Sequence, residues 1–336
     1  MSKTASHQKP RPYLAVLLLG IGMILGWILY LLTHQTPDTA PLDVIAIHPA
    51  DNAFHFTNPL LGFEVTDQKE LDEFKPLEQT INQKVSVLNQ DGQQHLVSVY
   101  VRDLNSGRWT GVNEDETFTP ASLMKVPVML TYLKQTETNP NFLSTKFTIT
   151  QDDLDTSPQD IPPTQGAKLG ESYAISDLLK FMIVYSDNVS LKSLFNHIDP
   201  KTLVELFQTI GINPPEVGTN FVISPKNYSF FFRLLYNATY LSPTESEFAL
   251  NLLSQSDFQS GLSKNIPKDI PIAHKFGEAA VQINGTNSYE LHDCGIVYVP
   301  QHPYFLCIMT RGTDKNQLED NISQLSETIF DAMKNP

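Results

Sequence analysis

The order of apolar and polar positions along the chain predicts regular secondary structure from about residue 76 onward. Residues 76–88, PLEQTINQKVSVL, space their apolar side chains as in an amphipathic helix. Two strand-like runs follow, HLVSVYVRDL and RWTGVNED, joined by the turn NSG. We expect the next helix to begin near Ala121, with Pro127 close to its start, because proline disrupts a helix interior.

The middle of the chain is predicted to be helical. After a polar, proline-rich loop at residues 151–169, SYAISDLLKFMIVY has helical spacing, with Ser176 as its expected cap. The tripeptide SDN interrupts this pattern, and VSLKSLFNHI resumes it. Further amphipathic helices are expected in DPKTLVELFQTIGI, in SPKNYSFFFRLLYNATY and around residues 243–255.

The pattern then changes to strands. PIAHKFGEAAV, HDCGIVYVP and YFLCIMTRG read as three strands, with PQHP as a hairpin turn between the last two and NQLEDNISQLSETIFDAM as a closing helix. This order predicts an α/β (α+β) fold: one antiparallel sheet built from N- and C-terminal strands, flanked by the C-terminal helix and an all-helical subdomain. Cys294 and Cys307 fall in the last two strands. Two cysteines are no disulfide framework, so we expect buried, unpaired thiols, although an exported domain could join them.

A long apolar run lies near the N-terminus. Residues 13–32 contain no charged side chain and match the length that a helix needs to cross a bilayer. Lys3, Lys9 and Arg11 precede this run, whereas the next basic side chain other than histidine is Lys69. The positive-inside rule therefore predicts a single-pass protein of the cell membrane, with a cytoplasmic N-terminus and an extracytoplasmic catalytic domain.

The alternative to an anchor is a cleaved signal peptide. The apolar core is longer than signal peptides have, and THQTPDTA is a poor cleavage site. We therefore expect a cytoplasmic tail at 1–12, a transmembrane anchor at 13–32, an extracytoplasmic stalk at 33–75 that packs partly on the domain, and a folded domain at 76–336.

Composition and charge restrict the classes of function. The chain has 336 residues, of which 41% are hydrophobic and 18% charged, which is typical of a globular domain. A formal net charge of −14 argues against a nucleic-acid partner, because such proteins present a basic face. No Cys/His cluster has zinc spacing and no glycine-rich phosphate loop occurs, so we expect neither a metal nor a cofactor.

Candidate chemistry lies in three short motifs, which stand in the order SLMK at 122–125, SDN at 186–188 and HKFG at 274–277. A serine hydroxyl needs a neighbouring base to act as a nucleophile. Positions i and i+3 share a helix face, so Lys125 can reach Ser122 Oγ, provided that the lysine is neutral. Lys275 would supply a second positive charge that favours the neutral form. Taken singly, the motifs also fit a helix N-cap with a solvated lysine, an ordinary turn and a surface lysine.

Together the three motifs resemble the Ser-x-x-Lys, Ser-Asp-Asn and Lys-Thr-Gly set of serine β-lactamases and penicillin-binding proteins, most closely the class A β-lactamases. The resemblance covers about residues 76–336. It implies a β-lactamase/transpeptidase-like fold and an acyl-enzyme on Ser122, with Lys125 as the base. It also implies that Ser186 relays a proton to the leaving nitrogen.

The same resemblance implies how substrate is held. Asn188 would bind the substrate amide and the lysine side chain, and Lys275 would attract the substrate carboxylate. The backbone N–H groups of Ser122 and Glu278, the latter just past Gly277 of the Lys-x-Gly motif, would form an oxyanion hole.

Two departures from the family pattern bear on activity. Phe276 stands where the family has Thr or Ser, so a hydroxyl that helps to bind the substrate carboxylate is lost. The deacylating glutamate of class A enzymes lies in a long loop, but the connection from Ile210 to Pro225 is too short for that loop. Glu216 keeps an E-x-x-x-N spacing with Asn220 and is the candidate base, although an acid in such a turn is usually only solvated.

We therefore expect a membrane-anchored serine hydrolase that acts on a small-molecule β-lactam and hydrolyses its amide bond. A D-Ala-D-Ala carboxypeptidase or penicillin-binding protein that acts on peptidoglycan peptides is one alternative, and a β-lactam sensor without turnover is another. A catalytically dead scaffold is disfavoured, because every side chain of the three motifs that the mechanism needs is present.

Overall fold

The computed structural model describes residues 43–48, 53–60, 62–66, 74–88, 96–155, 159–215, 220–283 and 285–334. The chain divides into two units, and the first, residues 1–43 and 66–69, lies almost wholly outside these ranges. The predicted anchor at 13–32 and Glu216 also lie outside the described residues. Within the described ranges, no helix has both the length and the apolar character needed to cross a membrane.

The second unit, residues 44–65 and 70–336, contains the fold. Its strands are β1 (Asp43–Ile47, with its first residue in the other unit), β2 (Gly62–Thr66, with its last residue there), β3 (Leu96–Asp103), β4 (Trp109–Val112), β5 (Lys146–Thr148), β6 (Ser172–Ala174), β7 (Ile272–Ile283), β8 (Thr286–Val297) and β9 (Tyr304–Gly312). Its α-helices are α2 (Lys75–Leu88), α3 (Lys125–Thr136), α4 (Ile175–Val184), α5 (Asn188–His197), α6 (Pro200–Thr209), α7 (Pro225–Tyr236), α8 (Pro243–Ser254) and α9 (Lys315–Met333). Short 3-10 turns are η2 (Ala121–Met124), η3 (Phe142–Ser144) and η4 (Gln151–Asp153).

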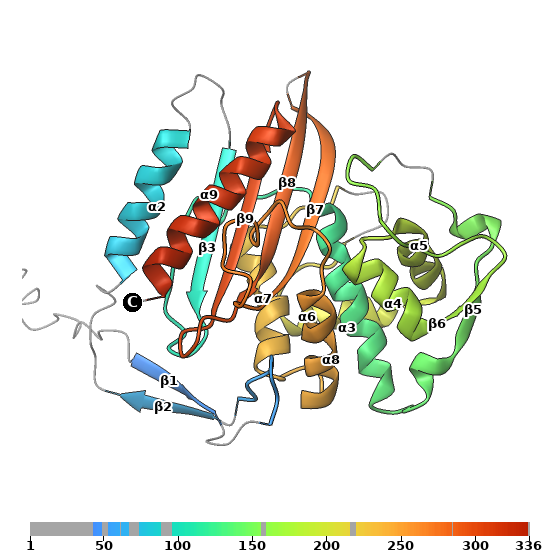
Figure 1. Ribbon diagram of the computed structural model, residues 1–336. Coiled ribbons are helices and arrows are strands. Elements are labelled where there is room, and N and C mark those ends of the chain that lie inside the picture. Colours follow the sequence, from blue (N-terminus) through green and yellow to red (C-terminus); the bar gives the residue numbers. More distant parts are fainter. Residues whose placement is uncertain are drawn as a thin grey trace, which may run out of the picture. The chain divides into compact units, whose positions relative to one another are not determined.

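One five-stranded sheet organises the molecule. Its strand order is β4-β3-β9-β8-β7, and each neighbouring pair is antiparallel. The early hairpin β3–β4 is thus joined to the late strands through the β3–β9 pair (Figure 1). This arrangement confirms the predicted single antiparallel sheet built from both ends of the domain.

Helices α2 and α9 cover one face of the sheet (Figure 1). Helix α2 places Leu77, Ile81 and Val85 at four-residue intervals, so that they form one buried stripe. They join a core to which β3 contributes Val99 and Val101, two residues apart on the same side of the strand. Each such side chain contributes about 1.5–3 kcal/mol when buried. The predicted helical spacing of 76–88 is confirmed.

Helix α3 lies at the centre of the second core, together with α4, α7 and α8. Its residues are buried almost all the way round, including Lys125. Pro127 lies in its first turn, as predicted, where a missing N–H costs nothing. A charged side chain at the start of such a helix is removed from water, and this burial governs the chemistry of the site.

The start of α4 differs from the prediction. Ser176 is not the cap: the helix begins at Ile175, with Ala174 at the N-cap position. The Asp177 carboxylate accepts the Ala174 N–H at 3.3 Å and thereby does the work of a capping side chain. Residues Ser172–Ala174, which were expected to be helical, instead pair with β5 as strand β6.

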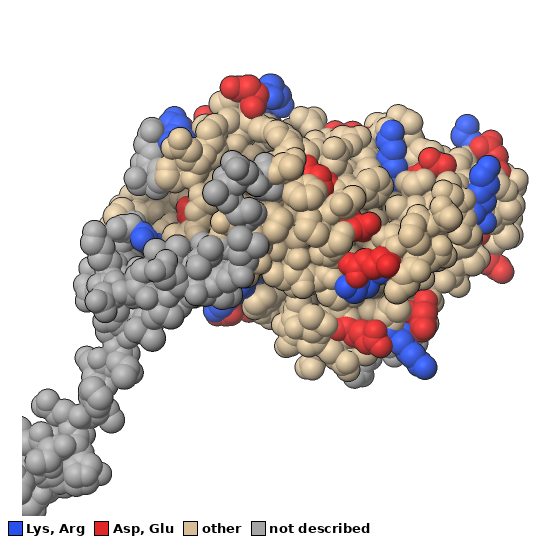
Figure 2. Space-filling view, turned by 90° about the horizontal axis from the view of Figure 1, so that it is seen from below, with Lys and Arg blue, Asp and Glu red and all other residues tan. Residues whose placement is uncertain are grey.

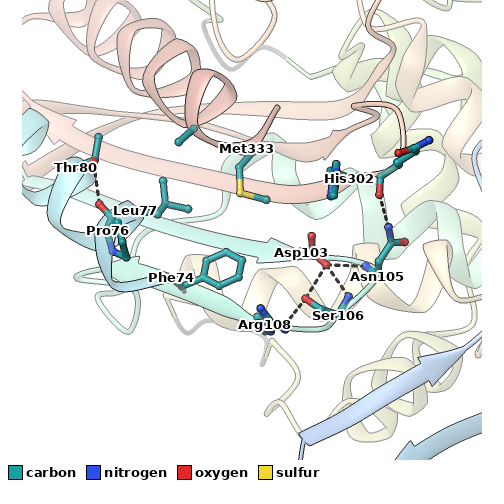
Figure 3. A pocket seen from close by; sticks show the side chains of 12 residues that line it. Phe74, Pro76, Leu77, Thr80, Asp103, Asn105, Ser106, Arg108, His302 and Met333 are labelled. Atoms are coloured by element: carbon teal, nitrogen blue, oxygen red, sulfur yellow. Dashed lines mark hydrogen bonds between the residues drawn. The ribbon is translucent and has the colours of Figure 1, made fainter. Parts of the chain in front are cut away.

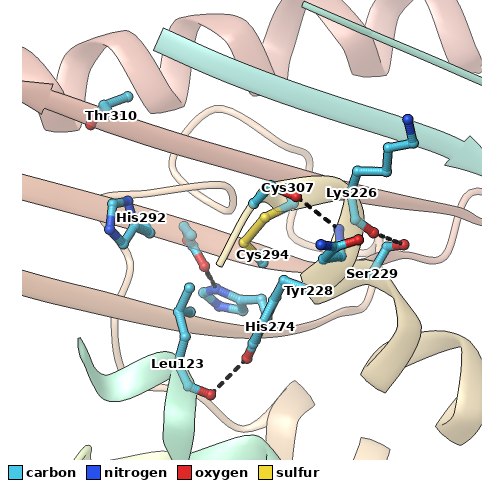
Figure 4. The surroundings of a disulfide bond; sticks show 12 residues. Leu123, Lys226, Tyr228, Ser229, His274, His292, Cys294, Cys307 and Thr310 are labelled. Atoms are coloured by element: carbon cyan, nitrogen blue, oxygen red, sulfur yellow. Dashed lines mark hydrogen bonds and ion pairs between the residues drawn. A yellow bond between two sulfur atoms is a disulfide. The ribbon is translucent and has the colours of Figure 1, made fainter. Parts of the chain in front are cut away.

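The prediction of two unpaired thiols is wrong. Cys294 and Cys307 form a disulfide between β8 and β9 (Figure 4). The two residues are register partners in adjacent antiparallel strands, so their side chains lie opposite each other on one face. Both are buried.

Charge on the visible surface is mixed. In the face shown in Figure 2, the lysine and arginine side chains of the described residues stand singly among acidic ones, without a continuous basic stripe.

Residues 53–60, which fall in the segment predicted as a stalk, pack on the domain. The Glu247 carboxylate of α8 accepts the backbone N–H groups of His55, Phe56 and Thr57 at 2.9–3.1 Å. The Phe56 ring is buried against Tyr298, with 5.1 Å between ring centroids. These contacts join part of the predicted stalk to the helical layer.

Candidate active site

The three sequence motifs meet where β7 passes the start of α3. Ser122 lies in the 3-10 turn η2, half-exposed, directly ahead of α3. A Cβ at Gly277 of β7 would lie 2.7 Å from the Pro120 carbonyl oxygen and 3.2 Å from the Leu123 nitrogen. Only glycine permits the strand to lie this close to the turn that carries Ser122.

Two residues of the site have left-handed backbone. Ala121, next to Ser122, has φ 48°, and Ser186 of the SDN turn has φ 59°. Non-glycine residues adopt this region at an energetic cost, and such residues cluster at functional sites. At both positions the strained backbone adjoins or carries a serine of the candidate site.

Ser186 joins the two lysines. Lys125 Nζ donates to the Ser186 carbonyl oxygen at 2.6 Å, to Ser186 Oγ at 3.0 Å and to Asn188 Oδ1 at 2.8 Å. Lys275 Nζ donates to the same Ser186 Oγ at 3.0 Å and to the Phe276 carbonyl oxygen at 3.1 Å. A hydroxyl has two acceptor lone pairs and one proton. With both lone pairs engaged by lysines, the Ser186 proton is the one left to donate to a third group.

Burial lowers the pKa of both lysines. The pKa of Lys125 falls from 10.5 to about 7, chiefly through desolvation, against the opposing charges of Asp187, Asp155 and Glu278. Desolvation, followed by the charge of Lys125, holds the pKa of Lys275 well below its ordinary value. Desolvation thus makes a neutral Lys125 accessible near pH 7, and a charged Lys125 in turn disfavours the protonation of Lys275.

Asp187, the middle residue of the SDN motif, positions the site by capping a helix, a role that the sequence analysis did not assign to it. Its carboxylate caps α5 by accepting the Ser190 N–H at 2.8 Å, and it also accepts the Ala167 N–H at 3.2 Å. This cap fixes the turn that presents Ser186 and begins the helix that carries Asn188. This cap could have been predicted, because an aspartate directly before a helical pattern is typical of an N-cap.

Phe276 is part of the core beside Lys275. Its ring is buried and stacks on Phe258, with 4.2 Å between centroids, and Lys275 Nζ lies 4.1 Å from the Phe276 centroid. The side chain therefore fills core beside the lysine and offers substrate no polar group.

A buried histidine–aspartate pair lies behind β7. His274 Nδ1 lies 2.8 Å from Asp293 Oδ1, and because a carboxylate only accepts, the imidazole donates. Asp293 also accepts the Leu262 N–H at 2.9 Å, and Gly261 packs so close that a Cβ would collide with the carboxylate. The carboxylate is fixed in position, and its charge opposes the loss of a proton from Lys275.

The remaining predicted site residues are placed as follows. Gly277 lies against the Ser122 turn, as described, and Glu278 follows it with its carboxylate turned to Lys315, 2.9 Å away. The backbone of Glu278 thus follows directly on the close approach of β7 to η2. Glu216, the candidate deacylating base, lies outside the described residues. The roles assigned to all these residues remain predictions.

Other candidate sites are separate from these motifs. Among the described residues, no group of three or more His, Cys, Asp or Glu side chains is arranged to hold a metal ion. A hollow of about 730 Å³ lies between the ends of α2 and α9 and the β3–β4 turn, lined by Phe74, Leu77, Asp103 and Met333 among others (Figure 3). None of the three motifs lines this hollow.

The comparisons with known proteins agree on one family. Residues 76–333 match the model of the family described as "Beta-lactamase enzyme family". The beta-lactamase of Streptomyces albus G is 24% identical over 247 residues, which is 67% of this chain and 75% of that protein.

Solved structures share the fold at low identity. A variant of PBP-A, solved as an acyl-enzyme complex with penicillin G, is 22% identical and superposes with a TM-score of 0.65 over 77% of this chain and 98% of that one. A class A beta-lactamase from Bacteroides cellulosilyticus DSM 14838 is 16% identical and gives a TM-score of 0.66 over 77% and 99%.

Proposed function

Because the chain belongs to the beta-lactamase enzyme family and is a serine hydrolase that acts through an acyl-enzyme, we propose that β-lactams acylate Ser122 and that their amide bond is hydrolysed. The observation that carries this proposal is the shared contact of Lys125 and Lys275 with Ser186 Oγ, 3.0 Å from each amine. A solved neighbour that forms an acyl-enzyme with penicillin G supports the choice of substrate.

The proposed acylation begins at Lys125. In its neutral form this amine takes the Ser122 proton, and Oγ attacks the carbonyl carbon of the β-lactam. The N–H groups of Ser122 and Glu278 stabilise the oxyanion that forms. Ser186, whose lone pairs are engaged by the two lysines, delivers its proton to the departing ring nitrogen and is reprotonated through Lys125. The ring C–N bond breaks, and the acyl group stays on Ser122.

Deacylation separates the proposed lactamase from its nearest alternative. Water must attack the acyl-enzyme with the help of a base, and Glu216 is the acid that the sequence offers. The short connection between α6 and α7, and the apolar Phe276 ring in place of a hydroxyl, favour a slow second step. The second candidate is therefore a peptidase or sensor of the penicillin-binding type, with a long-lived adduct.

One experiment tests the proposal and separates the two candidates. The full chain in detergent is incubated with benzylpenicillin while adduct mass and ring opening are followed, with Ser122→Ala as the control. An adduct on Ser122 with continued ring opening supports the lactamase. A persistent adduct supports the penicillin-binding alternative, and the absence of an adduct on folded wild-type protein overturns both.

We further propose that residues 13–32 anchor the domain on the outer side of the cell membrane. The proposal rests on the uncharged run and on the basic residues that precede it. The full chain should sediment with membranes after alkaline washing, whereas a chain that lacks residues 1–32 should not. Recovery of the full chain in the soluble fraction would contradict the anchor.

A further inference from the structure

A segment of the loop before β6 crosses between the two sides of the candidate site. Residues 159–167, called the strap below, leave the helical side at Gln159, whose Nε2 donates to the Ser186 carbonyl oxygen at 3.4 Å. Two residues later the strap reaches the sheet, where the Ile161 N–H donates to Glu278 Oε1 at 2.7 Å. It therefore spans the gap between the SDN turn and the Lys-x-Gly strand.

The sheet end of the strap is held by charge and by burial. Lys315, at the start of α9, lies 2.9 Å from Glu278 Oε2 and 3.8 Å from Asp160 Oδ2. The Ile161 side chain packs against the core on the α9 side of the sheet. The hydrogen bond from the Ile161 N–H to Glu278 Oε1 is charge-assisted, and such bonds are about twice as strong as neutral ones.

The strap then returns to the helical side. Thr164 Oγ1 donates to Asp257 Oδ2 at 2.7 Å, and the Ala167 N–H donates to Asp187. Gly166 lies so close to Asp187 that a Cβ would be 2.5 Å from its Oδ1. Pro162 and Pro163 stiffen the part between these anchors.

The strap lies where an extended ligand would bind. Among the described strands β7 is an edge of the sheet, and exposed edges accept a further strand unless something covers them. At Glu278 the strap contacts this edge, through the hydrogen bond from the Ile161 N–H to the Glu278 carboxylate. Beyond it, a hollow of about 220 Å³ lies between Asp160, Lys315 and the next residues of β7.

We propose that the strap sets the size of the acyl donor: compact, bicyclic β-lactams reach Ser122 with the strap in place, whereas a peptide that extends along β7 past Gly277 must displace it. The inference rests on the proposed function, and it names the substrate class of that same site. Glu278 is thus a specificity determinant through its carboxylate, in addition to the backbone role assigned to it.

The test compares acylation of the full chain by two probes: benzylpenicillin and a pentapeptide ester that ends in D-Ala-D-lactate. The double variant Lys315→Met/Thr164→Val removes the ion pair and the hydroxyl contact without changing a residue of the three motifs. Opening the strap should raise the ratio of peptide to penicillin acylation rate constants about tenfold, because the hydrogen bond from the Thr164 hydroxyl to the Asp257 carboxylate and the weak, exposed Lys315–Asp160 ion pair no longer oppose displacement. Penicillin labelling of Ser122 should change by less than about twofold.

Lys264→Met is the matched control. It breaks an ion pair with Asp320 of α9, the helix that also carries Lys315, and it does not touch the strap. The ratio of peptide to penicillin acylation rate constants in this variant should equal that of the wild type. Equal changes for both probes in the double variant, or an unchanged ratio, overturn the strap proposal while leaving the proposed function intact. If neither probe labels Ser122 of the folded wild type, the proposed function fails and the inference fails with it.

Discussion

At the scale of single residues, burial decides the chemistry. Lys125 begins a helix that is buried on nearly every side, and Lys275 lies on a buried stretch of β7. Desolvation disfavours the charged form of an amine and lowers the pKa of both lysines, so Lys125 can accept a proton without a dedicated base beside it. The surrounding carboxylates moderate this effect and keep the pKa of Lys125 at about 7.

A pH profile of acylation tests this account of Lys125. Only the neutral amine accepts the Ser122 proton, so the acylation rate constant should rise with pH through about 7 and then level off. Pre-steady-state labelling with benzylpenicillin between about pH 5 and about pH 9 measures it. A flat profile across this range would exclude Lys125 as the titrating base.

The same shift has a consequence for stability. The folded state lowers the pKa of Lys125 from 10.5 to about 7, so between these values the unfolded chain binds more protons. The Lys125 contribution to the free energy of unfolding is therefore smallest below about pH 7 and increases with pH toward 10.5. Lys125→Met should remove this part of the pH dependence.

Restoring the family's hydroxyl at position 276 should damage the fold. Phe276→Thr removes a buried ring that stacks on Phe258, and large-to-small core changes of this kind cost about 3 kcal/mol. Urea unfolding measures the loss, and Phe276→Leu, which keeps most of the volume, should cost about half as much. A Thr variant as stable as the wild type would show that the ring is not part of the core.

At the scale of elements, β8 and β9 hold the segment that leads to Ser122. Glu290 is buried, accepts the Thr119 N–H at 2.9 Å and pairs with Arg311 at 2.6 Å. Arg311 in turn donates to the Thr117 carbonyl oxygen at 3.1 Å. His292 Nε2 lies 3.1 Å from the Thr119 carbonyl oxygen. Desolvation lowers the pKa of His292 to about 4, so it is neutral at physiological pH. The sheet thus fixes the approach to the nucleophile.

Removing the centre of this arrangement should be costly. Glu290→Ala leaves Arg311 without its buried partner and should lower the free energy of unfolding by about 3 kcal/mol, because breaking a buried pair leaves a charge uncompensated. Acylation of Ser122 should slow as well, since residues 117–119 lose their anchor. Glu290→Gln, which keeps an acceptor for the Thr119 N–H, should recover much of both. A loss below about 0.5 kcal/mol in the Ala variant would contradict the positioning role.

Hydrophobic periodicity was sufficient to predict most elements, because α2 and α9 and the strands of the main sheet each bury one face or a continuous apolar run. Motif order and spacing led us to group residues that the structure joins by hydrogen bonds, Lys125 and Lys275 to Ser186, whereas the shared role of these residues with Ser122 stays a prediction. The strap escaped prediction because a polar, proline-rich loop has no periodicity, and its anchors come from distant segments. The disulfide could not be predicted because it depends on the register of β8 and β9, which the sequence does not determine. A shift of one residue would have separated Cys294 from Cys307.

At the scale of the whole molecule, residues 53–60, far upstream of α2, are part of the stable unit. Phe56→Ala in the full chain should lower the free energy of unfolding by about 3 kcal/mol, because its ring is buried against Tyr298. A chain that begins at residue 74 should lose at least as much. Val87→Ala, at an exposed apolar position, is the control and should change stability little. Thermal and urea unfolding measure all three, and a stable truncated chain would limit the domain to residues after 74.

The pairing of β3 with β9 also constrains how the protein is made. It joins residues about 200 positions apart, so the central ladder of the sheet cannot form until nearly the whole chain has left the ribosome. Until then the β3–β4 hairpin exposes the edge of β3 that later pairs with β9, and an open edge of this kind invites aggregation. The strand that closes the sheet against β3 is thus among the last parts of the domain to be synthesised.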